Sequence, residues 1–487
     1  MAGPAGYLRL LKSMKPEKKS SALSAGIGYT IGNILIKGIN ILTLPIFSRI
    51  MTTEEFGIFN VFLSYDAILF VIVGFALHSS VRSANLEFRG QVDRYCSSVS
   101  LIYLLMALLL TLAVLLFGET ISGILGFDKA VLYLLILYST GSAVLTLYNT
   151  RISLDYAYKR YLAVAAVNSL GNIVLSLILI LTAFRSQREM GRILGATAVT
   201  TAVGIWLLAG MYRREKPRYN REYWRFGLKY SLPIVPHGVS QVLLAQFDRI
   251  MIRSMVSDAA AGIYALAANI KLILTVITSS ISASWSTWFY TEMDRGNKTT
   301  IQQRSAQLGA LFTILTVGLM ALSPELIWLL GGEDYELAKY VAIPMVVDAF
   351  VLFLYDVIVS GEYYTKKTGF IMMGTVVAAA LNVVLNYIFI RKYGFIAAAY
   401  TTLASYVCYL MLHLLISRKL TGFYILPLKW LLVYAAIVTA AAALNLLLIE
   451  SLLLRWLLCA VIVLPMLGLL IRSVGGIGAV LRRKSRP

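Results

Sequence analysis

Charged side chains are scarce in this sequence of 487 residues, of which only 14% are Asp, Glu, Lys or Arg while 59% are hydrophobic. A soluble domain of this length carries roughly twice that share of charge. Apolar runs of about twenty residues recur along the whole chain, and each is long enough to cross a hydrocarbon core of about 30 Å. No segment is polar enough to form a separate soluble domain. The composition therefore predicts an all-α polytopic membrane protein.

Cysteine and histidine are also rare, with three of each. Cys96, Cys408 and Cys459 are scattered without ligand spacing, so we expect no disulfide, no metal site and no other cofactor. No Walker P-loop occurs, so the chain carries no ATPase of its own. Every predicted outer loop is too short to carry the catalytic groups of a membrane glycosyltransferase or polymerase. These absences indicate that the chain is not an enzyme and leave an exporter or a flippase.

The apolar runs predict about fourteen transmembrane helices. Their expected ranges are 22–46, 57–79, 95–117, 129–150, 161–184, 191–212, 229–254, 262–289, 305–331, 338–361, 369–391, 394–417, 424–449 and 452–472. If the N-terminus is cytoplasmic, 30 of the 44 Lys and Arg residues lie on the inner side and 10 on the outer side. By the positive-inside rule, both termini of this multi-pass chain then face the cytoplasm, and the chain lies in the cell membrane. The same rule explains the formal charge of +20 without a nucleic-acid partner.

Three short motifs recur in order at nearly constant spacing, which indicates an internal duplication. TTEEFGIF at 52–59 is echoed by SDAAAGIY at 257–264, NIVLS at 172–176 by NVVLN at 382–386, and GRILGA at 191–196 by GFIAAA at 394–399. Each copy holds six spans, an even number, so both copies cross the membrane in the same sense. We therefore predict two pseudo-symmetric six-helix bundles related by an axis along the membrane normal.

This duplication divides the chain into predicted segments. They are a basic cytoplasmic N-terminal segment at 1–21, a first lobe at 22–212, a basic cytoplasmic linker at 213–228, a second lobe at 229–417, a C-terminal helix pair at 424–472 and a basic cytoplasmic tail at 473–487.

Several ionisable residues fall inside predicted spans, where they cost at least a few kcal/mol and are candidates for function. Lys37 lies close to the bilayer midplane by residue counting. Asp66 follows Gly57 by nine residues and Lys271 follows Gly262 by nine, so the two occupy equivalent positions in the repeats with opposite charge. One interpretation is a polar central cavity lined from both halves. The alternative is an ion pair between Lys37 and Asp66 that only locks two helices together.

Two further groups of charges lie in the predicted second lobe. Asp248 and Arg249 are adjacent in the seventh span, so their side chains point about 100° apart on a helix. Asp348 and Asp356 are eight residues apart in the tenth span, roughly on one helical face. Either aspartate of this second pair is a candidate proton or cation site. The alternative is a hydrogen bond that packs two helices together.

Two longer segments resemble a known family. GYTIGNILIKGINILTLPIFSRIMTTEEFGIFN at 28–60 and FDRIMIRSMVSDAAAGIYALA at 247–267 are similar to motifs of the polysaccharide transporter branch of the multidrug/oligosaccharidyl-lipid/polysaccharide (MOP) flippase superfamily. This resemblance implies a Wzx-type flippase that works by alternating access. Its cargo would be an oligosaccharide on polyprenyl pyrophosphate, moved to the outer leaflet for capsule, exopolysaccharide or O-antigen synthesis.

The resemblance also gives the charged residues expected roles. An anionic pyrophosphate suits a cationic cavity, which Lys37, Arg249 and Lys271 would supply. The carboxylates Asp66, Asp248, Asp348 and Asp356 are then the candidates for coupling or for lining the cavity. Expected partners are membrane lipids, a polysaccharide polymerase and chain-length machinery. Two alternatives stay open, namely a MATE-like cation-coupled exporter of small molecules and a membrane assembly component without a transport cycle.

Overall fold

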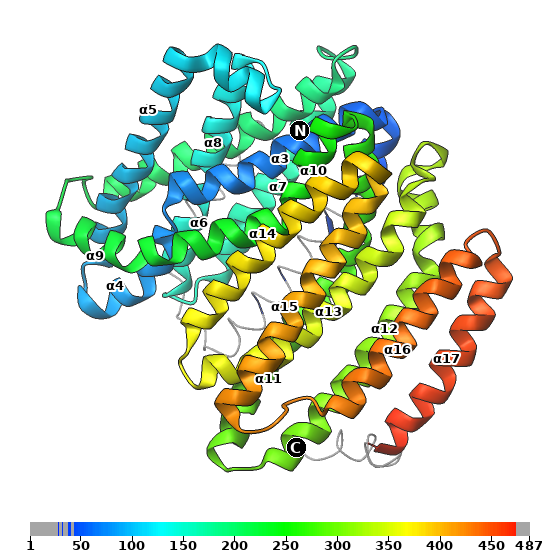
Figure 1. Cartoon of the computed structure of the whole chain (residues 1–487). Helices are drawn as coiled ribbons and strands as arrows, with labels where there is room; N and C mark the ends of the chain where they lie inside the picture. The colour runs from blue at the N-terminus through cyan, green and yellow to red at the C-terminus, as the bar shows by residue number, and fades with distance from the viewer. Residues whose placement is uncertain (1–27, 29–31, 33–37, 40–42, 474–487) are drawn as a thin grey trace. The chain divides into compact units, whose positions relative to one another are not determined.

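The structure, a computed structural model, describes residues 28, 32, 38–39 and 43–473 (Figure 1). Within these residues the chain forms helices, turns and short loops, and no strand. The longer helices are α3 (Thr53–Gly74), α5 (Val92–Leu125), α6 (Lys129–Ser153), α7 (Tyr158–Leu181), α8 (Arg188–Arg214), α10 (Val235–Met255), α11 (Asp258–Asp294), α12 (Lys298–Gly331), α13 (Ala338–Tyr364), α14 (Thr368–Tyr393), α15 (Ile396–Thr421), α16 (Leu428–Leu447) and α17 (Leu452–Ser473). Two shorter α-helices are α4 (Val81–Glu87) and α9 (Arg221–Ser231).

Twelve of the described helices are long and apolar enough to cross a membrane, and each coincides with one predicted span. The predicted first span, 22–46, lies mostly outside the described residues. The predicted seventh span corresponds to α10, which has a suitable length but carries Asp248, Arg249 and Arg253. This arrangement confirms the predicted class, an all-α polytopic membrane protein, with twelve candidate spans among the described residues.

Side-chain caps fix where two of the equivalent helices begin. Before α3, the Thr52 hydroxyl accepts a hydrogen bond from the Glu55 backbone N–H, and the Glu55 carboxylate accepts one from the Thr52 N–H, which is a capping box. Before α11, the Ser257 hydroxyl accepts from the N–H of Ala260. The recurring motifs at 52–59 and 257–264 are therefore both helix starts.

The described residues fall into two compact units. One holds Leu69–Val235. The other holds Thr43–Ile68 together with the chain from Pro236 onward. Most of α3, from Thr53 to Ile68, thus groups with the second unit, whereas the predicted first lobe, 22–212, contains all of that helix.

The first unit contains α5 to α8, with α9 packed on it. Part of the predicted linker 213–228 is therefore helical, which the sequence analysis did not anticipate. The Asn220 side chain caps this helix by accepting from the backbone N–H groups of Glu222 and Tyr223. Tyr223 is buried in an aromatic cluster with Phe88 and Tyr95. The aromatic side of α9 thus faces the protein while its basic side chains face outward.

In the second unit α13 lies at the centre and packs against α11, α12, α14, α15 and α16. The helix pair α16 and α17 packs on α12, and the three lie side by side in Figure 1. Pro324 and Pro344 lie within α12 and α13, where neighbouring helices surround the backbone that a proline leaves without a partner.

The other recurring motifs occupy matching helix pairs. NIVLS lies in α7 and GRILGA in α8, which pack together in the first unit. NVVLN lies in α14, and GFIAAA spans the start of α15, which packs on α14 in the second unit. In the first pair Gly195 permits a close approach, because a Cβ there would lie 2.5 Å from the Ser176 hydroxyl oxygen. Each unit thus contains one copy of the same motif-bearing helix pair.

Candidate functional site

The central helix α13 carries a buried ion pair with α11. The Nζ atom of Lys271 lies 3.1 Å and 3.4 Å from the two carboxylate oxygens of Asp348. The side chain of Asp348 is almost wholly buried, and that of Lys271 is 18% exposed. Lys271, predicted to meet an anionic cargo, is therefore held by a carboxylate in this structure. This partner is not predicted from the sequence.

Asp248 is buried in a network of neutral hydrogen-bond donors from three other helices. Its carboxylate accepts from the hydroxyl of Tyr264 at 2.5 Å, the amide of Asn386 at 2.7 Å and the hydroxyl of Thr402 at 2.8 Å. Asn382 extends the network by donating to Thr402. Among the described residues no cation lies within ion-pair distance of Asp248. The carboxylate is thus satisfied by oriented dipoles and not by a counterion.

Arg249 follows Asp248 on α10 and has different surroundings. Its guanidinium donates to the side-chain oxygen of Gln246 at 2.5 Å, one turn earlier on the same helix. In the part of the chain that the structure describes, no carboxylate forms an ion pair with Arg249. It is half-buried. Of the two predicted cavity cations that are described, Arg249 is therefore the one whose charge is not compensated by direct contact.

The third aspartate of this unit, Asp356, also faces α11. It accepts a short hydrogen bond from the hydroxyl of Ser282. Just beyond it, the indole N–H of Trp285 donates to the Ser360 hydroxyl at 3.1 Å. Asp348 and Asp356 thus both contact α11, and polar contacts recur along the interface between these two helices.

Two predicted site residues remain, Lys37 and Asp66. Lys37 lies outside the described residues. Asp66 lies half-buried in α3, within the part of that helix that belongs to the second unit. The proposed choice between a cavity and an ion pair of Lys37 with Asp66 therefore stays a prediction.

A second buried ionisable pair was missed by the sequence analysis. The Nδ1 atom of His413 on α15 lies 2.7 Å from a carboxylate oxygen of Glu362 on α13, and neither side chain is exposed. The rings of Tyr355 and Tyr409 pack against the imidazole. Among the residues that the structure describes, the second oxygen of Glu362 and Nε2 of His413 have no hydrogen-bond partner. Glu362 stands one residue beyond the predicted tenth span and His413 inside the twelfth, so a search for ionisable groups in apolar runs would have found them.

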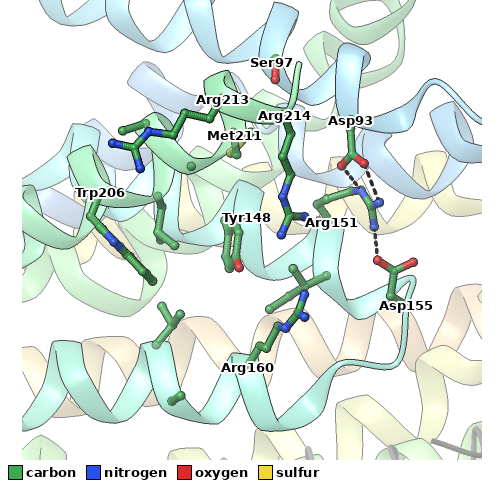
Figure 2. A pocket seen from close by; sticks show the side chains of 16 residues that line it. Asp93, Ser97, Tyr148, Arg151, Asp155, Arg160, Trp206, Met211, Arg213 and Arg214 are labelled. Carbon is green, nitrogen blue, oxygen red and sulfur yellow. Dashed lines mark hydrogen bonds and ion pairs between the residues drawn. The ribbon is translucent and has the colours of Figure 1, made fainter. Parts of the chain in front are cut away.

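The first unit contains a cavity of about 370 Å³ lined by four arginines. Arg151 is fixed there, because its guanidinium makes two bonds to the carboxylate of Asp93, at 2.6 Å and 3.0 Å, and one to Asp155 at 2.8 Å. Figure 2 shows Arg160 and Arg214 extending into the space beside Tyr148. In the sequence these arginines contribute only to the inner-loop charge, and their convergence on one cavity is visible only in the structure.

Comparison with known proteins identifies the family. A family model described as polysaccharide biosynthesis protein matches residues 23–285, which is more than half of the chain. The chain belongs to this family. The matched range includes both segments that resemble the flippase branch, so the match confirms that resemblance.

Relatives and solved structures agree with this assignment. The chain is 22% identical to the "Probable low-salt glycan biosynthesis flippase Agl15" of Haloferax volcanii over 393 residues, 79% of this chain and 80% of that protein. It superposes on the lipid II flippase MurJ in its inward closed conformation with a TM-score of 0.69 and 15% identity, covering 92% of this chain and 99% of that one. An inward-facing MATE family multidrug transporter of the MOP superfamily gives a TM-score of 0.62 at 14% identity, covering 85% and 98%. The chain therefore has the fold of MOP superfamily transporters.

Proposed function

We propose that the chain is a flippase that moves an oligosaccharide linked to polyprenyl pyrophosphate from the inner to the outer leaflet of the cell membrane. The product would serve capsule, exopolysaccharide or O-antigen synthesis. Membership of the polysaccharide biosynthesis family and the similarity to a glycan flippase support this cargo class. The fold shared with MOP transporters supports a transport cycle.

The observation that carries the proposal is the set of ionisable groups buried in the second unit. Asp248, Lys271 and Asp348 lie inside helices that are otherwise apolar enough to span a membrane or pack among such helices. Each ionisable group there costs at least a few kcal/mol, so their retention favours a functional role over simple packing.

Anion binding is assigned to the cations of this set. Arg249 has no carboxylate partner among the described residues, and a guanidinium matches two oxygens of a pyrophosphate at once. Lys271 offers a compact point charge, once Asp348 no longer holds it. Lys37 completes the proposed cationic cavity by its position in the sequence.

Coupling is assigned to the carboxylates, with Asp348 as the central group. A proton bound to Asp348 would cancel the negative charge that attracts Lys271, and the ammonium group would become available to the cargo. Proton binding and cargo binding would then favour each other, because such linkage is reciprocal. Asp66, Asp248 and Asp356 remain further candidates for the coupling or cavity carboxylates.

The transport step follows from the predicted duplication. Two six-helix lobes that rock against each other would expose the binding cavity first to the cytoplasmic side and then to the outer side. A polysaccharide polymerase and chain-length machinery are the expected recipients of the flipped product.

The proposal is tested with the purified protein in proteoliposomes that contain a fluorescent polyprenyl-pyrophosphate oligosaccharide. Lys271→Gln should lower the flipping rate about tenfold or more, while Lys271→Arg should keep part of it, since charge matters more than shape at this position. Lys339→Gln is the matched control, because Lys339 is also an ion-paired lysine of the second unit, but its partners are Glu336, just before α13, and Glu450, between α16 and α17. It should flip the cargo at nearly the wild-type rate.

Four outcomes would contradict the proposal. Full flipping by Lys271→Gln would remove this lysine from the mechanism. Wild-type transport after the exchange Lys271→Asp with Asp348→Lys would show that the ion pair only packs helices. Export of cationic drugs without any lipid flipping would favour a MATE-like exporter, and a folded protein that moves neither cargo would favour an assembly component.

A further inference from the structure

The cavity of the first unit carries positive charge that its own residues do not balance. Its charged lining consists of Asp93, Asp155, Arg151, Arg160, Arg213 and Arg214, a formal excess of two positive charges. Both aspartates bind Arg151. Among the described residues, no carboxylate lies within ion-pair distance of the other three arginines. The cavity therefore offers unbalanced positive charge to a negatively charged group.

The ion pairs of Arg151 give the cavity a fixed wall. Arg151 stands at the end of α6, and Asp93 stands in the first turn of α5. One residue further on, Arg94 forms an ion pair at 3.0 Å with Glu215, which directly follows α8. The start of α5 is thus tied to the end of α6 and to Glu215, the residue that follows Arg214.

The open arginines approach the cavity from two helices. Arg160 comes from the first turn of α7 and is half-buried, whereas Arg214 is the last residue of α8 and is exposed. Figure 2 shows both extending beside the ring of Tyr148. Two guanidinium groups that meet across a small space can share the oxygens of one phosphate, because each presents paired N–H donors.

One side of the cavity is apolar and continues onto exposed helix surface. Trp206 on α8 lines the cavity and is 46% exposed. On α7, Ala163 and Val164 line it, and Val167 and Leu170 beyond them are exposed. Both helices are apolar enough to span a membrane, so this surface is suited to lipid chains. Tryptophan favours the level of the lipid headgroups, where an apolar ring meets a polar layer.

We propose that this cavity binds a phosphate group, carried by an anionic membrane lipid or by a soluble phosphate compound, through Arg160 and Arg214. Arg151 is a positioning residue, because its ion pairs with Asp93 and Asp155 fix the wall of the cavity. The apolar rim with Trp206 favours the lipid as the source. This site lies wholly in the first unit and does not depend on what the second unit transports.

The test uses the purified full chain in lipid nanodiscs. Retention of phosphatidylglycerol is measured by native mass spectrometry, and binding of sodium pyrophosphate is measured by the shift of the melting temperature in phosphatidylcholine discs. Wild-type protein is compared with the double variant Arg160→Gln, Arg214→Gln. Arg225→Gln is the matched control, because Arg225 is an exposed arginine of α9 outside the cavity.

Loss of a charge-assisted hydrogen bond weakens binding about tenfold, so the double variant should bind roughly a hundredfold more weakly than the wild type or the control. If phosphatidylglycerol retention falls and pyrophosphate never binds, the source is a lipid. If pyrophosphate binds the wild type and not the double variant, the source is a soluble phosphate. Arg160→Lys with Arg214→Lys should restore part of the binding and shows that the fold is intact. Equal binding by the wild type and the double variant, or equal loss in Arg225→Gln, would overturn the proposal.

Discussion

Gly57 and Gly262 pack backbone against backbone where α3 crosses α11 in the second unit. A Cβ atom on Gly57 would lie 1.9 Å from the carbonyl oxygen of Asp258, and one on Gly262 would lie 2.0 Å from the carbonyl oxygen of Thr53. The contact is reciprocal, as in an interface between two copies of one motif. These glycines come from the two recurring sequences at 52–59 and 257–264, so the duplicated motif packs against itself.

We predict that Gly57→Ala and Gly262→Ala each destabilise the protein, by about 1–3 kcal/mol or more, because a methyl group cannot fit where two helix backbones meet. The measurement is the melting temperature of the purified protein in detergent. Gly318→Ala in α12 is the matched control, since no atom of another described residue outside its own helix backbone lies within 4 Å of a Cβ there. It should melt at the wild-type temperature or above, and similar losses in all three variants would contradict the packing argument.

The buried pair of Glu362 and His413 should stabilise the fold. Removing the carboxylate with Glu362→Ala leaves the imidazole in a buried site without its partner, at a cost of about 1–3 kcal/mol. Glu362→Gln keeps an oxygen next to Nδ1 and should cost less. Melting temperatures of the two variants check this order, and equal values for both would show that the hydrogen bond does not matter.

Proposed coupling through Asp348 predicts a specific loss of pH dependence. In Asp348→Asn the side chain no longer gains or loses a proton, so flipping should proceed at a rate that changes little with pH. Asp66→Asn and Asp356→Asn test the other candidates in the same assay. If all three variants keep both the rate and the pH profile of the wild type, none of these carboxylates couples transport to protons.

A second pH effect concerns stability at the start of α13. The hydrogen bond from the Lys339 ammonium, 2.6 Å away, lowers the pKa of the Glu450 carboxyl below its usual value of about 4.3. The pair therefore contributes its full stabilisation above the pKa of the unfolded chain and loses it as the pH falls through the lowered pKa. Glu450→Gln should lower the melting temperature slightly at neutral pH and low salt. The difference in melting temperature from the wild type should vanish at acidic pH, where the Glu450 carboxyl is protonated. A constant difference at every pH would exclude this pair as its cause.

Orientation in the membrane is predicted by the distribution of Lys and Arg. A reporter fused after Pro487 that works only in the cytoplasm should be active, and one that works only outside should be silent. The reverse pattern would show that the count of 30 inner against 10 outer basic residues does not set the orientation.

The helices of this fold follow from local sequence, whereas the contacts between side chains do not. Apolar runs of sufficient length correctly predicted twelve spans, because a membrane helix must be apolar over its full length. The α9 helix was missed because its basic residues dominate the pattern and its aromatic face, with Tyr223, is short.

The sequence does not predict which side chains far apart along the chain contact each other. Lys271 was known to be buried in a span, but any of several carboxylates could have matched it, and its partner Asp348 stands 77 residues away. The arginine cavity was hidden for the opposite reason, because inner basic residues are so common that Arg160 and Arg214 carried no distinct signal.

The central position of α13 has a consequence for the tolerance of the chain to mutation. In its most apolar stretch 83% of residues are buried, against 11% in α17. Asp348, Asp356 and Glu362 are each bonded to another helix, so even the polar positions of α13 are constrained. A deep mutational scan should find that substitutions are not tolerated at nearly every position of α13. A helix with one exposed face would instead tolerate substitutions with a period of 3.6 residues. Along α17 the same scan should accept most apolar exchanges, except at Arg455, which is buried and ion-paired with Glu325 of α12. Substitutions should therefore be tolerated over most of α17 and rejected over most of α13.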